Sequence, residues 1–108
     1  MSTLWIVTRH PGAREWIRAQ GWKGNCIDHL DIGCVQAGDI VLGTLPANLA
    51  ADICGAGARY VHLALRIPAE LRGVELTPAQ MQQYGADLRA YEIREIPFDP
   101  SELQSKGD

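Results

Sequence analysis

The sequence contains few of the residues that mark several common classes of protein. Serine occurs only at positions 2, 101 and 105, so an active site built on a serine nucleophile is disfavoured. No G-x-x-x-x-G-K-[ST] motif is present, and no G-x-G-x-x-G follows the first apolar run, which argues against a P-loop and a dinucleotide fingerprint. No apolar run approaches the roughly 20 residues of a membrane span, and the N-terminus lacks a basic-then-apolar signal. We expect a cytoplasmic protein with no membrane partner.

Cysteine is also scarce. Cys26, Cys34 and Cys54 are an odd number, widely spaced and without a C-x-x-C pair, which fits neither a disulfide framework nor a zinc site. We predict that all three are small buried apolar side chains. His29 stands between two aspartates, but no histidine pair at i, i+4 supports a metal site there. The sequence therefore predicts no metal and no cofactor.

Charge and length limit the class of partner. A chain of 108 residues predicts one domain, and 46% hydrophobic with 21% charged residues is ordinary for a folded soluble domain. The formal net charge of -3 provides no general attraction to duplex DNA, which we exclude as a partner. Any nucleotide partner must be small and bound in a local pocket.

Apolar runs alternate with amphipathic segments along most of the chain. Such alternation is typical of an α/β fold, here a Rossmann-like three-layer sandwich with a mostly parallel sheet. Residues 1–96 are predicted to form this single domain, and residues 97–108 a polar tail that packs loosely. Strands are predicted at 4–7, 26–30, 39–42, 60–65 and 91–96, and helices after Pro11, after Pro46 and from Pro78 to about Leu88. Thr77 and Gln80 are predicted to form a capping box at the start of the last of these helices.

Two strand-turn-helix units of similar design organise the domain. The first strand stops at Thr8-Arg9-His10 before a Pro-Gly pair, and the strand at 39–42 stops at Gly43-Thr44-Leu45 before Pro46. Parallel strands end at the same edge of a sheet, where ligands bind in α/β domains. We therefore expect residues 8–10 to lie near Thr44 and Asn48, with Thr44 or Leu45 capping the second helix.

Arg9 and His10 are the neighbouring residues best suited to chemistry on a phosphate. An arginine at a strand end can bind a phosphate through two hydrogen bonds, and a neighbouring imidazole can transfer a proton near neutral pH. The alternative is that Arg9 pairs with a surface carboxylate and His10 caps the following helix. Because Arg9 and His10 directly follow an apolar strand, we favour the role in phosphate binding and proton transfer.

A second group could bind an anion or a ribose. It comprises Thr44, Asn48 and the amides of Gly43 and of the helix start, because a helix N-terminus offers free N–H groups. The alternative is that Thr44 only caps the helix. His62 lies inside an apolar strand and is predicted to be a hydrogen-bonded core histidine.

These side chains suit internal cleavage of an RNA-type phosphodiester. In that reaction the 2′-hydroxyl of the substrate is itself the nucleophile. The protein aligns this hydroxyl with the scissile phosphate, stabilises the developing charge and assists proton transfer. The residues are compatible with this reaction but do not identify it.

The blocks T-R-H-P-G-A at residues 8–13 and G-T-L-P-A-N-L-A at 43–50, followed by G-A-R-Y-V-H-L at 57–63, resemble a small CRISPR-associated family. This family is the sixteenth of the Csx series and is found beside type III CRISPR systems. The resemblance covers residues 3 to 95. It implies a fold akin to CARF sensors and a homodimer that binds cyclic oligoadenylate across its two-fold axis.

The resemblance further implies a ring nuclease that linearises cyclic tetra-adenylate without a metal and so switches off antiviral signalling. Within the matching blocks we assign Arg9 as the phosphate clamp and His10 as the candidate acid or base. The candidate ligand-binding residues from the same blocks are Thr8, Pro11, Gly12, Gly43, Thr44, Leu45 and Asn48.

Three alternatives stay open. A protein of the same fold could bind the cyclic nucleotide without cleaving it. Residues 7–12 are also similar to the strand-end R-H-G of histidine phosphatases, although Pro11 interrupts that triplet. The third alternative is a CRISPR accessory protein with a purely structural role. Burial of Arg9 and His10 away from any cleft would favour this alternative.

Overall fold

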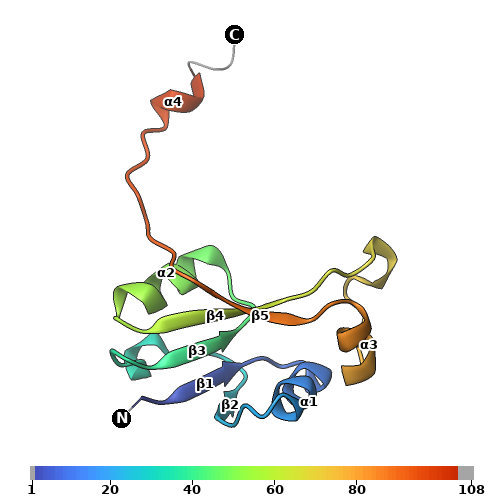
Figure 1. Ribbon diagram of the computed structural model, residues 1–108. Coiled ribbons are helices and arrows are strands. Elements are labelled where there is room, and N and C mark those ends of the chain that lie inside the picture. The colour runs from blue at the N-terminus through green and yellow to red at the C-terminus, as the bar shows by residue number, and fades with distance from the viewer. Residues whose placement is uncertain (1, 105–108) are drawn as a thin grey trace.

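The computed structural model describes residues 2–104, which form a five-stranded sheet in the order β2-β1-β3-β4-β5 (Figure 1). β2, β1, β3 and β4 run parallel, and β5 pairs antiparallel with β4. The predicted α/β sandwich with a mostly parallel sheet is therefore confirmed. The elements are β1 (Leu4–Val7), α1 (Pro11–Ala19), β2 (Asn25–Ile27), η1 (Ile32–Cys34), β3 (Ile40–Gly43), α2 (Ala47–Gly55), β4 (Arg59–Ala64), η2 (Ala69–Leu71), α3 (Pro78–Gln83), β5 (Asp87–Tyr91) and α4 (Ser101–Gln104).

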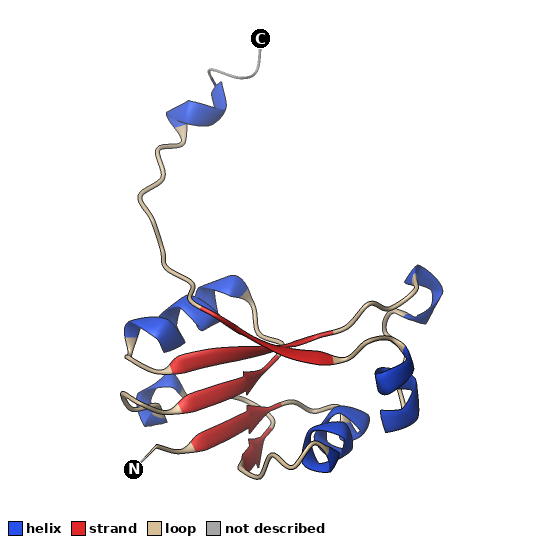
Figure 2. Cartoon of the chain, viewed as in Figure 1, coloured by secondary structure: helices blue, strands red, loops and turns tan. Residues whose placement is uncertain are grey.

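Helices cover both faces of the sheet, and each face has its own apolar core (Figure 2). Successive residues of β1 point to opposite faces, so Ile6 packs under α1 and α3 while Val7 packs toward α2. α1 contributes Trp16 and Ile17 to the first core, and α2 contributes Ile53 to the second. A strand buried on both sides must be apolar at every position, which is why residues 4–7 lack alternation.

The start of α1 follows from its sequence. His10 is the N-cap and Pro11 occupies the first turn, where its missing N–H is not needed. The helix ends at Ala19, two residues before Gly21, whose φ of 92° suits glycine.

α2 begins differently from the prediction. Its N-cap is Pro46, with no side-chain cap, and the first helical residue is Ala47. The expectation that Thr44 or Leu45 caps this helix is wrong. Thr44 instead donates its hydroxyl to the Leu63 carbonyl at 3.2 Å, which turns it toward β4.

The capping box at the start of α3 is confirmed, with reciprocal hydrogen bonds between Thr77 and Gln80. The helix is shorter than predicted because Gly85, at φ 73°, terminates it. Leu88 therefore lies in β5, opposite Leu63, and not on the helix. The strand predicted at 91–96 is also wrong, since β5 occupies Asp87–Tyr91 and the chain then leaves the sheet.

The predicted burial of the cysteines is wrong for two of the three. Cys26 lies on the edge strand β2 and Cys34 in η1, and both are exposed, whereas Cys54 is half-buried. All three are free thiols. An edge strand and a surface turn lack a covering layer, so an apolar side chain there stays in contact with solvent.

After β5 the chain runs away from the domain as an extended arm, residues 94–104, that ends in the short helix α4 (Figure 1). Ile96, Phe98 and Leu103 on this arm are 73%, 61% and 65% exposed. Ile93, just before it, still packs against the α2 core. Among the described residues, no helix is long and apolar enough to cross a membrane.

Candidate functional site

The carboxyl ends of β1 and β3 lie side by side where the connections diverge. β1 continues through α1 toward β2 on one side, and β3 continues through α2 toward β4 on the other. Such a divergence leaves a crevice at the strand ends, which is the usual ligand site of open α/β sheets. A cleft of about 530 Å³ lies here, within the range of small-molecule sites. Its lining residues are Thr8, Arg9, His10, Pro11, Ala13, Thr44, Leu63, Leu65, Ile67, Gly73, Val74, Glu75, Leu76 and Met81.

The structure brings together only part of the predicted site. Thr8, Arg9, His10, Pro11 and Thr44 line the cleft, as the two strand-turn-helix units predict. The other predicted ligand-binding residues do not line it; they are Gly12, Gly43, Leu45 and Asn48. For Leu45 and Asn48 the reason is the layering, since the cleft opens over the α1 and α3 face whereas α2 covers the opposite face.

Close backbone packing explains why glycine occupies positions 12 and 43. A Cβ on Gly12 would lie 1.9 Å from the Leu76 carbonyl oxygen, and one on Gly43 would lie 2.5 Å from the Val7 carbonyl oxygen. Neither position has room for a side chain. The first glycine lets the loop at residues 73–76 approach α1, and the second lets β3 approach β1.

Arg9 is exposed at the rim of the cleft. Within residues 2–104 its guanidinium has no hydrogen bond and no salt bridge to another side chain or to the backbone. The alternative of a surface ion pair therefore finds no support in the described part of the chain. A guanidinium left free beside a cleft is available to bind a phosphate or carboxylate through two hydrogen bonds.

Arg14 of α1 fixes the turn that carries Arg9. Its Nε donates to the Thr8 carbonyl at 2.9 Å, and its guanidinium also pairs with Asp28. The Thr8 N–H donates to the Ile27 carbonyl, and the Thr8 hydroxyl accepts from the His10 N–H at 3.1 Å. No local sequence signal marks Arg14, because its partners come from two different strand ends.

Both ring nitrogens of His10 face backbone amides. The Ala13 N–H donates to Nδ1 at 3.1 Å, so His10 caps α1, as the helix-cap alternative predicts. Leu76 N lies 2.9 Å from Nε2. The imidazole thus stands between the start of α1 and the 73–76 loop, and in its neutral form it accepts a hydrogen bond from one of the two.

The β3–α2 turn is held by a tyrosine that sequence reasoning did not single out. The Tyr60 hydroxyl accepts from the Leu45 N–H at 3.0 Å, so this amide is not free for a ligand. The hydroxyl also lies 2.7 Å from Nδ1 of His62 and 3.3 Å from the Gly43 carbonyl oxygen. Burial raises the pKa of the Tyr60 hydroxyl, which stays protonated. His62 is hydrogen-bonded, as predicted, but it is half-buried and belongs to neither core, because β4 is covered only in part at this position.

The sequence did not predict the residues that form the floor and the far wall of the cleft. Leu63, Leu65, Ile67 and Met81 form an apolar floor, and the 73–76 loop adds Glu75. These residues carry no motif, since only the fold places a loop after β4 against the turn after β1. An apolar floor below a charged rim suits a ligand with a flat ring and an anionic group.

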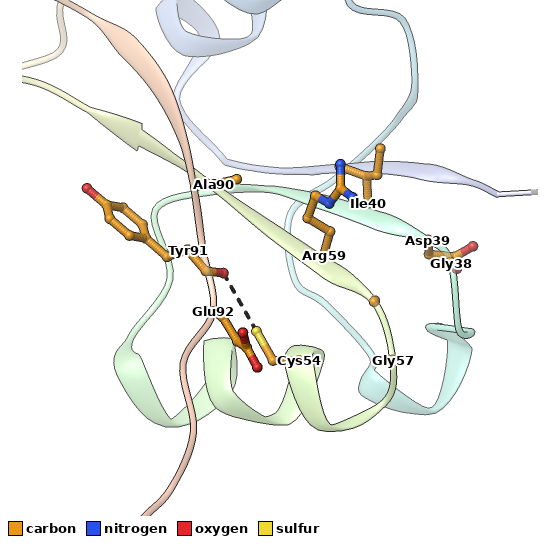
Figure 3. A pocket seen from close by; sticks show the side chains of 10 residues that line it. Gly38, Asp39, Ile40, Cys54, Gly57, Arg59, Ala90, Tyr91 and Glu92 are labelled. Atoms are coloured by element: carbon orange, nitrogen blue, oxygen red, sulfur yellow. Dashed lines mark hydrogen bonds between the residues drawn. The ribbon is translucent and has the colours of Figure 1, made fainter.

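A second hollow of about 510 Å³ lies at the amino ends of β3 and β4 (Figure 3). In Figure 3 the Tyr91 ring points to the opposite side from Arg59, and the Cys54 thiol is engaged by the Tyr91 carbonyl. Asp39 there is buried and fully used, because it accepts from Thr3, Trp5 and Gln36. Arg59 and Glu92 line this hollow with side chains that have no hydrogen bond or salt bridge within residues 2–104, but the hollow lies at the end of the sheet opposite the switch point.

The fold and the cleft define a Rossmann-like α/β domain with an arginine-rimmed crevice at its switch point. Residues 5–94 match the family described as "Putative CRISPR-associated protein (Cas_VVA1548)", and the chain belongs to that family. The comparisons with curated proteins and with solved structures gave no match. The expected CRISPR association is thereby confirmed, and the assignment to the sixteenth Csx family stays a prediction. In the part of the chain that the structure describes, no group of three or more His, Cys, Asp or Glu side chains could hold a metal ion.

Proposed function

We propose that the protein is a cytoplasmic ring nuclease of type III CRISPR systems that binds and linearises a cyclic oligoadenylate, most simply cyclic tetra-adenylate. The observation that carries the proposal is the free guanidinium of Arg9 at the rim of an apolar-floored cleft. An adenine ring fits the apolar floor and a phosphate fits the arginine, so one cleft offers both halves of an adenylate site. The CRISPR-associated family of the chain supports this class of ligand.

Cleavage proceeds by attack of a ribose 2′-oxygen on the neighbouring phosphorus. Arg9 holds the phosphate and stabilises the charge that develops on its oxygens. The turn that carries Arg9 is rigid, because Arg14 and Thr8 fix its backbone. A fixed turn keeps the hydroxyl and the phosphate aligned, which lowers the entropic part of the barrier. The nucleophile belongs to the substrate, so the reaction requires no metal-bound water.

A homodimer completes the ligand site in this proposal. One cleft of about 530 Å³ accommodates part of a multi-phosphate ring. Two copies related by a two-fold axis would present two Arg9 side chains to opposite phosphates of one ring. The symmetric ligand then explains how an acidic chain binds a polyanion.

Binding without cleavage is the second candidate function. It is favoured by the position of His10, whose ring nitrogens both face backbone amides. Arg9 and the apolar floor would suffice to bind the ring. The two functions share a ligand and differ in whether the ring is recovered intact.

The first test measures affinity for cyclic tetra-adenylate by titration calorimetry. Arg9→Ala should weaken binding by about tenfold or more, since a charge-assisted contact contributes about 1.5–3 kcal/mol. Arg18→Ala is the matched control, because Arg18 is an exposed arginine of α1 outside the cleft. Equal affinities in wild type and both variants would contradict the proposed site.

A further inference from the structure

The proton released by the 2′-hydroxyl needs an acceptor in the cleft. Among the described residues that line it, only three side chains titrate: Arg9, His10 and Glu75. Arg9 keeps its proton in proteins. Within the cleft of one copy, the candidate acceptors are therefore His10 and Glu75.

The His10 side chain is placed for a structural role, between the start of α1 and the 73–76 loop. A neutral imidazole has one acceptor nitrogen and one N–H, so it can accept from Ala13 or from Leu76 but not from both. An imidazolium can accept from neither. Taking up a substrate proton would thus turn two ring N–H groups toward two backbone N–H groups, at the 3.1 Å and 2.9 Å separations seen here. That product is strongly disfavoured while the 73–76 loop keeps its place.

Glu75 has the opposite character. Glu75 lines the cleft and is exposed, and its side chain has no hydrogen bond or salt bridge to another residue within 2–104. The next residue is held on both sides of its backbone, because the Leu76 N–H donates to Nε2 of His10 in the tautomer that accepts there, and the Leu76 carbonyl packs on Gly12. The loop therefore places Glu75, whose carboxylate is free, among the residues that line the same cleft as Arg9.

We propose that Glu75 is the catalytic base of the ring nuclease and that His10 is a positioning residue that holds its loop. This inference rests on the proposed function. In the step, the Glu75 carboxylate takes the proton of the 2′-hydroxyl while the 2′-oxygen bonds to phosphorus. The bond from phosphorus to the 5′-oxygen breaks, and that oxygen takes a proton from water. The products are a 2′,3′-cyclic phosphate and a 5′-hydroxyl, with no external oxidant or reductant.

The test measures single-turnover cleavage of cyclic tetra-adenylate across the pH range in which the protein stays folded. Glu75→Gln should lower the rate by about 10²–10⁴-fold, the usual contribution of a general base. It should leave affinity unchanged or raise it, because a carboxylate beside phosphates is removed. The wild-type rate should fall toward acid pH as the base is protonated, and this fall should vanish in Glu75→Gln. Glu75→Asp should keep the fall at a reduced rate.

Two controls separate Glu75 from its surroundings. Glu70→Gln changes the same charge on the same connection but does not line the cleft, so its rate should match wild type. His10→Asn keeps a side chain suited to capping α1 and should retain the acid-side fall with a smaller loss of rate than Glu75→Gln. A Glu75→Gln protein that cleaves at the wild-type rate would overturn the inference and leave the proposed function standing. A wild-type protein that neither binds nor cleaves the ring would overturn both.

Discussion

At the scale of single residues, the glycines of the motifs show how a functional signature can have a packing cause. Gly12 stands in the T-R-H-P-G-A block, yet the structure uses it as space for the Leu76 carbonyl. From sequence alone, a glycine after a strand suggests a ligand that approaches the backbone. The partner here is a loop more than 60 residues away, and no local pattern reveals it.

Gly12→Ala should destabilise the fold. The added Cβ would lie 1.9 Å from the backbone oxygen of Leu76, and a backbone atom cannot rotate away. We expect a loss of about 1–3 kcal/mol in the free energy of unfolding, typical of overpacking, measured by urea titration. Gly55→Ala is the matched control, because nothing lies within 4 Å of its added Cβ, and it should change stability by less than about 0.5 kcal/mol. Similar stabilities for the two variants would contradict this reading of Gly12.

The hydrogen bonds of the buried Asp39 carboxylate lead to a prediction of how the stability of the fold depends on pH. Hydrogen bonds from the Gln36 and Thr3 amides and from the Trp5 indole hold the pKa of its carboxyl below the usual range. A group with a lowered pKa in the folded state stabilises the fold above its unfolded-state pKa of about 3.9. This contribution is lost as the pH falls through the folded-state pKa.

Asp39→Asn should therefore be less stable than wild type at neutral pH, and the difference should shrink as the medium becomes acidic. The asparagine NH₂ group would also face amide donors, which adds to the loss at neutral pH. Thermal unfolding followed by circular dichroism at a series of pH values measures both effects. A difference that stays constant with pH would mean that the charge of Asp39 does not matter.

At the scale of elements, the β3–α2 turn depends on Tyr60 in the neighbouring strand. Tyr60→Phe removes only a hydroxyl, but it leaves the Leu45 N–H without its acceptor. We expect a loss of about 1–3 kcal/mol on unfolding by denaturant, the cost of an unsatisfied polar group. The Tyr84 ring packs against the other core and its hydroxyl has no hydrogen bond within residues 2–104, so Tyr84→Phe should be nearly neutral. Equal losses would show that ring packing, and not the hydroxyl, is what matters at Tyr60.

Element boundaries followed from the sequence wherever a strong local signal existed. The Thr77 capping box and the apolar run at 4–7 predicted their elements correctly. The end of α3 and the start of β5 were missed, because the helical spacing of Leu88 is accidental and pairing with Leu63 decides its state. Cross-strand pairing is a tertiary effect that overrides local pattern.

At the scale of the whole molecule, the sequence predicted the edge of the sheet where the cleft lies but not the loop that forms its far wall. Thr8, Arg9 and Thr44 meet because parallel strands end together. Asn48 does not join them, because α2 covers the opposite face. Glu75 could not be predicted, since its place depends on the contact between Leu76 and His10.

The boundary predicted between the domain and the tail at residues 96 and 97 can be tested by truncation. Removing residues 97–108 should change the unfolding free energy by less than about 0.5 kcal/mol, because Phe98 and Leu103 belong to neither core. Removing residues 92–108 also deletes Ile93, which packs on the α2 core and donates its N–H to Cys54. That longer truncation should cost about 1 kcal/mol or more. Destabilisation by the shorter truncation would show that the arm is part of the fold.

The most direct test of the central claim is incubation of the full chain with cyclic tetra-adenylate in excess chelator, with the products separated by chromatography. We predict linear di-adenylate that carries a 2′,3′-cyclic phosphate, formed by wild type and lost in Arg9→Ala. Recovery of the intact ring after tight binding would contradict the nuclease and leave a binding protein. Recovery of the intact ring without binding would contradict the assignment of the ligand itself.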